Sequence, residues 1–123
     1  MAKTKQKLSV QDYMDFWKNL WPGIKPVPSA IWFWESKIKK ISQKNRNLKA
    51  LILGVTPEIR DLLSKYQINT VCLDFNPIMA EAMTHLVKKK NPNEKILIGD
   101  WLKMPFPQNN FDIEMVTKLY LFS

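Results

Sequence analysis

The sequence predicts an α/β domain built on a parallel sheet, with strand order 3-2-1-4, helices on both faces and two further helices ahead of the first strand. Two short apolar runs carry this prediction: one breaks at Gly54, and the other ends at Asp74, twenty residues later. Between them, Ile59, Leu62 and Leu63 follow at the spacing of a helix that buries one face. Strands that alternate with helices in this way pair in parallel through right-handed crossovers.

Two helices are expected in the segment that precedes the first strand, residues 1–47. Ser9, with Asp12 three residues later, predicts a capping box at the start of a helix that should end near Trp21. A proline-rich link then leads to Ser29, the expected cap of the second helix. Large apolar residues recur at helical spacing in both, namely Val10, Tyr13, Met14, Trp17, Leu20, Trp21, Ile31, Trp32, Trp34, Ile38 and Ile41. The simplest interpretation is that most of the large aromatic residues among them pack against the sheet, and the functional alternative is that Tyr13 or Trp17 faces a ligand.

Residues 48–123 are expected to supply the sheet and its connecting helices, within a single domain overall. Pro57 suits the first turn of a helix, where its missing N–H costs nothing, and Asn76 before Pro77 predicts a capped start for the next. The strands and helices are expected at about 50–53, 57–66, 70–74, 77–87, 95–99 and 111–116. The lone His85 has no ligand partners at metal-binding spacing, which favours a surface or packing role.

Composition narrows the class of protein. The chain has 123 residues and a net charge of +8, and all of the excess charge lies in residues 1–49, with eleven Lys and Arg against three acids. Such a segment is a solvated helix face or, alternatively, a surface for nucleic acid or another anionic partner. No apolar run is long enough for a membrane span, and the first residues do not resemble a signal peptide, so we expect a soluble, cytoplasmic protein. The single Cys72 excludes a disulfide within one chain and indicates a buried structural thiol.

Three strand ends carry the chemistry: the Gly54 loop, Asp74, and the turn that begins at Gly99. A carboxylate at the second strand end can accept both hydroxyls of a ribose. A dinucleotide site repeats glycine so that the backbone can approach a pyrophosphate, whereas here Thr56 and Glu58 stand at those positions. The loop therefore argues against NAD and favours a nucleoside ligand that has a sulfonium charge and no phosphate, of which S-adenosyl-L-methionine is the common one.

With these motifs in place, the sequence resembles class I S-adenosylmethionine-dependent methyltransferases, which have a Rossmann-like fold, in a branch whose loop reads Leu-Gly-Val-Thr-Pro-Glu. The similarity extends over about residues 10–116 and rests on segments 26–29, 53–62, 73–79 and 93–112. The resemblance implies that the Gly54 loop receives the methionyl part, Asp74 the ribose, and Asp100 with Trp101 the adenine. The expected cofactor-binding residues are Tyr13, Trp17, Gly54, Val55, Thr56, Pro57, Asp74, Phe75, Asn76, Met79, Gly99, Asp100, Trp101, Leu102 and Thr117.

Two departures from the family pattern shape the functional expectation. Val116-Thr117-Lys118 stands where the family has Gly-Asp-Gly, and the chain stops at Ser123, whereas the family fold continues with three more strands. We therefore expect the cofactor-binding half of a methyltransferase, apparently truncated after the fourth strand, with an unknown methyl acceptor and no catalytic residue nominated. The alternative is a non-catalytic S-adenosylmethionine-binding or interaction module whose basic surface meets RNA or a protein partner. A fourth strand left as a sheet edge, beside the apolar residues 119–122, also predicts a homodimer or aggregation.

Overall fold

A computed structural model of the chain describes residues 8–19, 28–45, 47–103 and 110–116. The elements follow in the order α1 (Val10–Lys18), α2 (Pro28–Lys44), β1 (Lys49–Leu53), α3 (Pro57–Lys65), β2 (Asn69–Asp74), α4 (Pro77–Leu86), β3 (Glu94–Ile98), the 3-10 helix η1 (Trp101–Lys103) and β4 (Ile113–Val116). Strands and helices alternate from β1 onward, as the sequence predicts.

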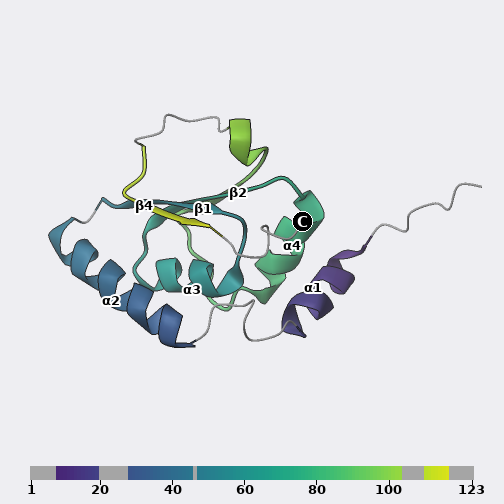
Figure 1. The fold of residues 1–123 in the computed structure, drawn as a ribbon, viewed down its shortest axis with the longest axis horizontal. Helices are drawn as coiled ribbons and strands as arrows, with labels where there is room; N and C mark the ends of the chain where they lie inside the picture. Colours follow the sequence, from purple (N-terminus) through teal and green to yellow (C-terminus); the bar gives the residue numbers. More distant parts are fainter. Residues whose placement is uncertain (1–7, 20–27, 46, 104–109, 117–123) are drawn as a thin grey trace, which may run out of the picture.

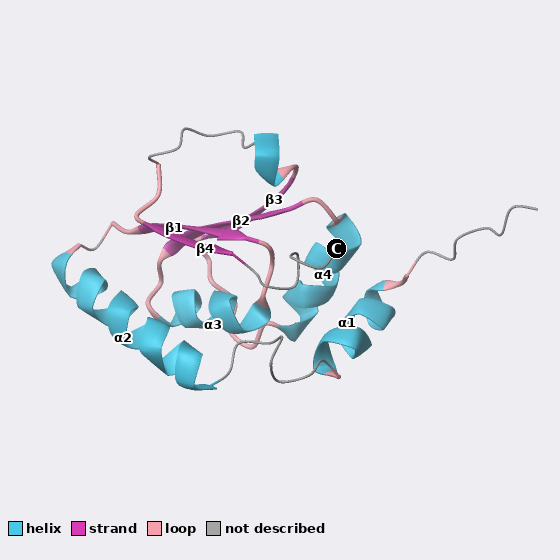
Figure 2. Cartoon of the chain, viewed as in Figure 1, coloured by secondary structure: helices cyan, strands magenta, loops and turns pink. Residues whose placement is uncertain are grey.

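The four described strands form one parallel sheet in the order β3-β2-β1-β4, so the predicted topology is confirmed. Figures 1 and 2 show α1 to α4 on one side of this sheet and η1 on the other. All four α-helices of the described chain therefore lie on one face of the sheet, and only the single-turn helix η1 lies on the other. This arrangement is an α/β Rossmann-like fold, and it brings the carboxyl ends of β1, β2 and β3 to a common edge.

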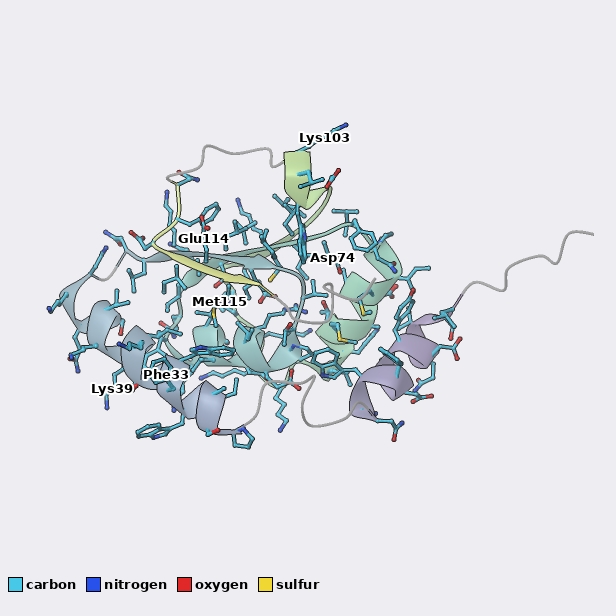
Figure 3. The ribbon with its side chains drawn as sticks, viewed as in Figure 1. Phe33, Lys39, Asp74, Lys103, Glu114 and Met115 are labelled. Carbon is cyan, nitrogen blue, oxygen red and sulfur yellow. The ribbon has the colours of Figure 1, made fainter. Side chains whose placement is uncertain are left out.

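The core lies between the sheet and the layer of α-helices. Ala50 and Ile52 of β1 are fully buried and pack with apolar residues of α3 and α4. The strand period of two is plain in β4, where Figure 3 shows Met115 on the helix side and Glu114 on the opposite side. Cys72 of β2 is buried here too, and burial, with smaller contributions from its neighbours, raises the pKa of its thiol to about 12. The predicted structural thiol is confirmed.

Helix α1 has the predicted start but a different end. The Ser9 hydroxyl accepts from the backbone of Asp12, and the Asp12 carboxylate accepts from the backbone of Ser9, which completes the capping box. The helix ends at Lys18, before the expected Trp21, with Asn19 as its C-cap; the Asn19 side-chain amide also donates to the Asp15 carbonyl at 2.7 Å. The residues that follow, 20–27, lie outside the described part of the chain.

Helix α2 corrects two expectations. It begins at Pro28, so Ser29 lies inside the first turn and is not its cap. The helix contacts α3, and its Ile38, which is 4% exposed, belongs to the core, whereas Trp32 is 72% exposed. The expectation that most of the tryptophans pack against the domain holds for Trp17 and Trp34 and fails for Trp32. At the other end of the helical layer, α4 ends at Leu86, and His85 is exposed on it, in keeping with the expected surface role.

Candidate functional site

Three loops meet at the carboxyl edge of the sheet. The N–H of Gly54, just after β1, donates to the Leu73 carbonyl at 2.9 Å, and the N–H of Gly99, just after β3, donates to the Asp74 carbonyl at 2.8 Å. These bonds continue the register in which Leu53 faces Leu73. The three strand ends that the sequence singles out are therefore held side by side.

The loop after β1 requires glycine at its first position. Gly54 has a φ of 124°, a conformation that residues with a Cβ rarely adopt. The chain then passes through Val55 and Thr56 into α3, with Pro57 in its first turn, and all four residues are buried. Because the loop is covered, a ligand can contact it only after neighbouring groups move.

Asp74 ends β2 next to this loop, and Figure 3 shows it at the side of the sheet nearer α4 than α2. Asp74 is fully buried, and its Oδ1 accepts a hydrogen bond from the Asn76 N–H at 3.4 Å. Asn76 in turn caps α4 as predicted, since its Oδ1 accepts from the N–H groups of Ile78 and Met79. The acid is thus at the expected position, at the start of a well-capped helix.

Helix α1 is tied to two of the three loops by its aromatic side chains. The Asn76 side-chain amide donates to the Tyr13 hydroxyl at 2.9 Å, and the indole N–H of Trp17 donates to Glu58 Oε1 at 3.0 Å. Trp17 is 3% exposed. Tyr13 and Trp17 therefore lie at the candidate site, where α1 bridges the loops after β1 and β2, and Trp17 is also a packing residue.

The residues expected around the adenine are spread over different environments. The Trp101 indole N–H donates to the Leu73 carbonyl at 2.8 Å, which places Trp101 beside the strand ends. Asp100 Oδ1 accepts from the Leu102 N–H and so caps η1, while the Leu102 side chain is 92% exposed. Phe75 is 54% exposed, whereas Met79 is 7% exposed and belongs to the core. Thr117 lies outside the described residues.

Two charged side chains of α3, Glu58 (partly buried) and Arg60 (buried), were not among the expected site residues. Glu58 lies in the first turn of α3, and its Oε2 is buried with no hydrogen-bond partner within the part of the chain that the structure describes. Arg60, 2% exposed, pairs with Glu94 at 2.6 Å and also donates to the Thr84 hydroxyl. The sequence gives no local signal for the burial of Arg60, because its partner Glu94 lies 34 residues away.

Among the described residues, no group of His, Cys, Asp and Glu is arranged to hold a metal ion. None of the described helices combines the length and apolar character needed to cross a bilayer. No protein-family model, curated protein or solved structure matches the chain.

Proposed function

We propose that the chain binds S-adenosyl-L-methionine at the carboxyl edge of the sheet, in the manner of class I methyltransferases. The observation that carries the proposal is the pairing of a positive-φ glycine after β1 with an acid at the end of β2, held together by the bond from Gly54 N–H to the Leu73 carbonyl. Parallel α/β sheets bind ligands outside the carboxyl ends of their strands.

Each part of the ligand has a matching group at this edge. The Asp74 carboxylate accepts the two ribose hydroxyls, and the Gly54 loop contacts the amino-acid part through its backbone. Phe75, which is exposed just after Asp74, and Trp101 of η1 supply flat faces for the purine. The sulfonium of the bound cofactor supplies the methyl group, and the residues of this edge hold and orient it.

The burial of the loop adds a requirement to the proposal. Gly54 and Asp74 are buried, and α1 is bonded to the first turn of α3 through Trp17 and to the N-cap of α4 through Tyr13. Binding therefore includes a local displacement of the groups that cover these residues. This cost lowers the apparent affinity, because only the open fraction of the chain is competent to bind.

The test is calorimetric titration with S-adenosylhomocysteine, the demethylated cofactor, on the unaltered chain and on Asp74→Ala. Loss of charge-assisted hydrogen bonds to the ribose should weaken binding by about 1.5–3 kcal/mol. Asp112→Ala is the control, since that carboxylate accepts from the Lys49 N–H at the opposite, amino end of β1. Absence of heat with the unaltered chain, or equal affinities for the Asp74 variant and the unaltered chain, would exclude the ribose assignment.

A second candidate function, an RNA-binding interaction module, is favoured by the outer face of α2. Trp32 and Phe33 are 72% and 52% exposed there, and Lys37 Nζ lies 5.4 Å from the centre of the Phe33 ring. Lys39, Lys40 and Lys44 are exposed on the same helix, and Figure 3 labels Phe33 and Lys39 on it. Flat side chains interleaved with lysines are the features that bind bases and phosphates of a single strand.

This second candidate predicts salt-dependent binding of single-stranded RNA. Lys39→Ala should lower the slope of log affinity against log salt by about 0.7, the value for one phosphate contact on a single strand. Trp32→Ala should weaken binding at every salt concentration, because base stacking on the indole is lost. The control is Lys95→Ala, an exposed lysine on β3. Fluorescence anisotropy measures both effects. Equal salt slopes for the unaltered chain, Lys39→Ala and Lys95→Ala would contradict the assignment.

A further inference from the structure

Glu58 has a half-satisfied carboxylate. Its Oε1 accepts from the Trp17 indole N–H at 3.0 Å, while its Oε2 is buried and has no hydrogen-bond partner within the described residues. Burying a carboxylate oxygen without a partner is unfavourable, and such atoms are rare in native structures. The arrangement is therefore expected to serve a partner that carries hydrogen-bond donors.

The position of Glu58 specifies the charge of that partner. Glu58 follows Pro57 in the first turn of α3, four residues beyond Gly54, so it lies on the turn that directly follows the loop after β1, and Asp74 ends the neighbouring strand β2. A carboxylate there repels a phosphate and attracts a cation. The free oxygen can accept from an ammonium group while the other oxygen keeps its bond to Trp17, because an ionised carboxylate has about four acceptor sites.

We propose that Glu58 recognises the α-ammonium group of the amino-acid portion of the bound nucleoside, with Trp17 as the positioning residue that holds the carboxylate in place. This assignment rests on the proposed function and adds to it the residue that selects ligands with a free amino group. Since Oε2 is buried, the ammonium reaches it as the covering groups move aside, and a new charge-assisted bond then offsets part of the cost of that movement.

The experiment compares S-adenosylhomocysteine with its deamino analogue, which keeps the adenosine, the sulfur and the carboxylate. On the unaltered chain, calorimetry should show the deamino analogue binding about tenfold more weakly. Glu58→Gln keeps the shape of the side chain and an acceptor for Trp17, and it should bind the two ligands with nearly equal affinity. Glu81→Gln, an exposed glutamate of α4, is the matched control and should preserve the tenfold preference.

Several outcomes separate this assignment from the proposed function. Equal binding of both ligands to the unaltered chain would overturn the role of Glu58 and leave the proposed function unaffected. This comparison needs no variant, so it is decisive even if Glu58→Gln fails to fold. A tenfold preference that persists in Glu58→Gln would also overturn the role. A chain that binds neither ligand would overturn the proposed function and this assignment together.

Discussion

Gly54, after β1, and Gly99, after β3, would tolerate an added side chain for different reasons and to different degrees. Gly54 has a φ of 124°, so any Cβ there is strained by the backbone itself. At Gly99 an added Cβ would lie 3.3 Å from Leu73 Cδ1, a side-chain atom that can shift by a few tenths of an ångström. The two positions thus separate backbone strain from simple crowding within one site.

We therefore predict that Gly54→Ala lowers the free energy of unfolding by about 1–3 kcal/mol, the usual cost of a sparsely populated backbone conformation. Gly99→Ala should cost clearly less, since only one neighbouring methyl group has to move. Urea denaturation followed by circular dichroism measures both variants. A larger loss for Gly99→Ala than for Gly54→Ala would show that the loop after β1 can relax its conformation.

The burial of Arg60 could not be predicted from the sequence. The apolar stripe of α3 correctly predicts that Ile59, Leu62 and Leu63 are buried. It does not predict that Arg60 is buried with them, because its partner Glu94 lies 34 residues away at the start of β3. A local pattern specifies which face of a helix is apolar, and a distant charge that neutralises a buried guanidinium leaves no local signal.

At the scale of elements, the start of α1 was predictable from the sequence, whereas its contacts with the loops were not. The capping box of Ser9 and Asp12 follows from their spacing alone. The bonds from α1 to the loops join residues 41 and 63 positions apart, Trp17 with Glu58 and Tyr13 with Asn76. They depend on how α1 docks beside α4, and this docking is set by packing of the whole helical layer. That Gly54 and Asp74 lie side by side was predictable for the opposite reason, since strand order alone makes the ends of β1 and β2 neighbours.

Helix α2 is held to α3 by a polar contact that titrates. The Glu35 carboxylate accepts from Lys65 Nζ and from the Tyr66 hydroxyl. These two bonds, that from Lys65 first, lower the pKa of Glu35 below its usual 4.5. Because the folded pKa is lower than the unfolded one, the contact stabilises the fold above about pH 4.5 and its contribution disappears as the pH falls through the folded value.

We predict that Glu35→Gln lowers the melting temperature at neutral pH, and that the difference from the unaltered chain shrinks as the pH falls below about 4.5. Thermal melts at a series of pH values measure it. Glu81→Gln, which removes an exposed acid from α4, should show no such pH-dependent difference. A difference that stays constant over this range would mean that Glu35 acts through packing rather than through its charge.

At the scale of the whole molecule, the fold was the most predictable property. Alternating strand and helix patterns with right-handed crossovers leave few arrangements, and the observed order β3-β2-β1-β4 is the expected one. The burial of the candidate site residues under other parts of the chain was not predictable. Burial of Gly54 and Asp74 depends on how segments far apart in the chain pack over the sheet edge, and no local pattern encodes that packing.

The edges of the sheet predict whether the chain associates with copies of itself. Within the described sheet, β4 is hydrogen-bonded to β1 on one side only, and β3 is the edge on the other side. An edge strand presents unpaired N–H and C=O groups to other chains. β3 carries the exposed Lys95, a charge that discourages such pairing, although Ile98 on the same strand is 52% exposed. In β4, Ile113 and Met115 are partly buried and pack against the core.

We therefore predict that the chain self-associates through β4, as a dimer that pairs the β4 edges of two copies. Light scattering should show the average mass rising with concentration toward that of two chains. Hydrogen exchange measured at low and high concentration locates the contact: the amides of residues 113–116 should exchange more slowly at high concentration, whereas those of β3 serve as the internal control and should not change. A mass that stays that of one chain at high concentration would contradict the prediction. Protection confined to β3 would place the interface at the opposite edge, where the exposed Ile98 rather than β4 would supply the contact.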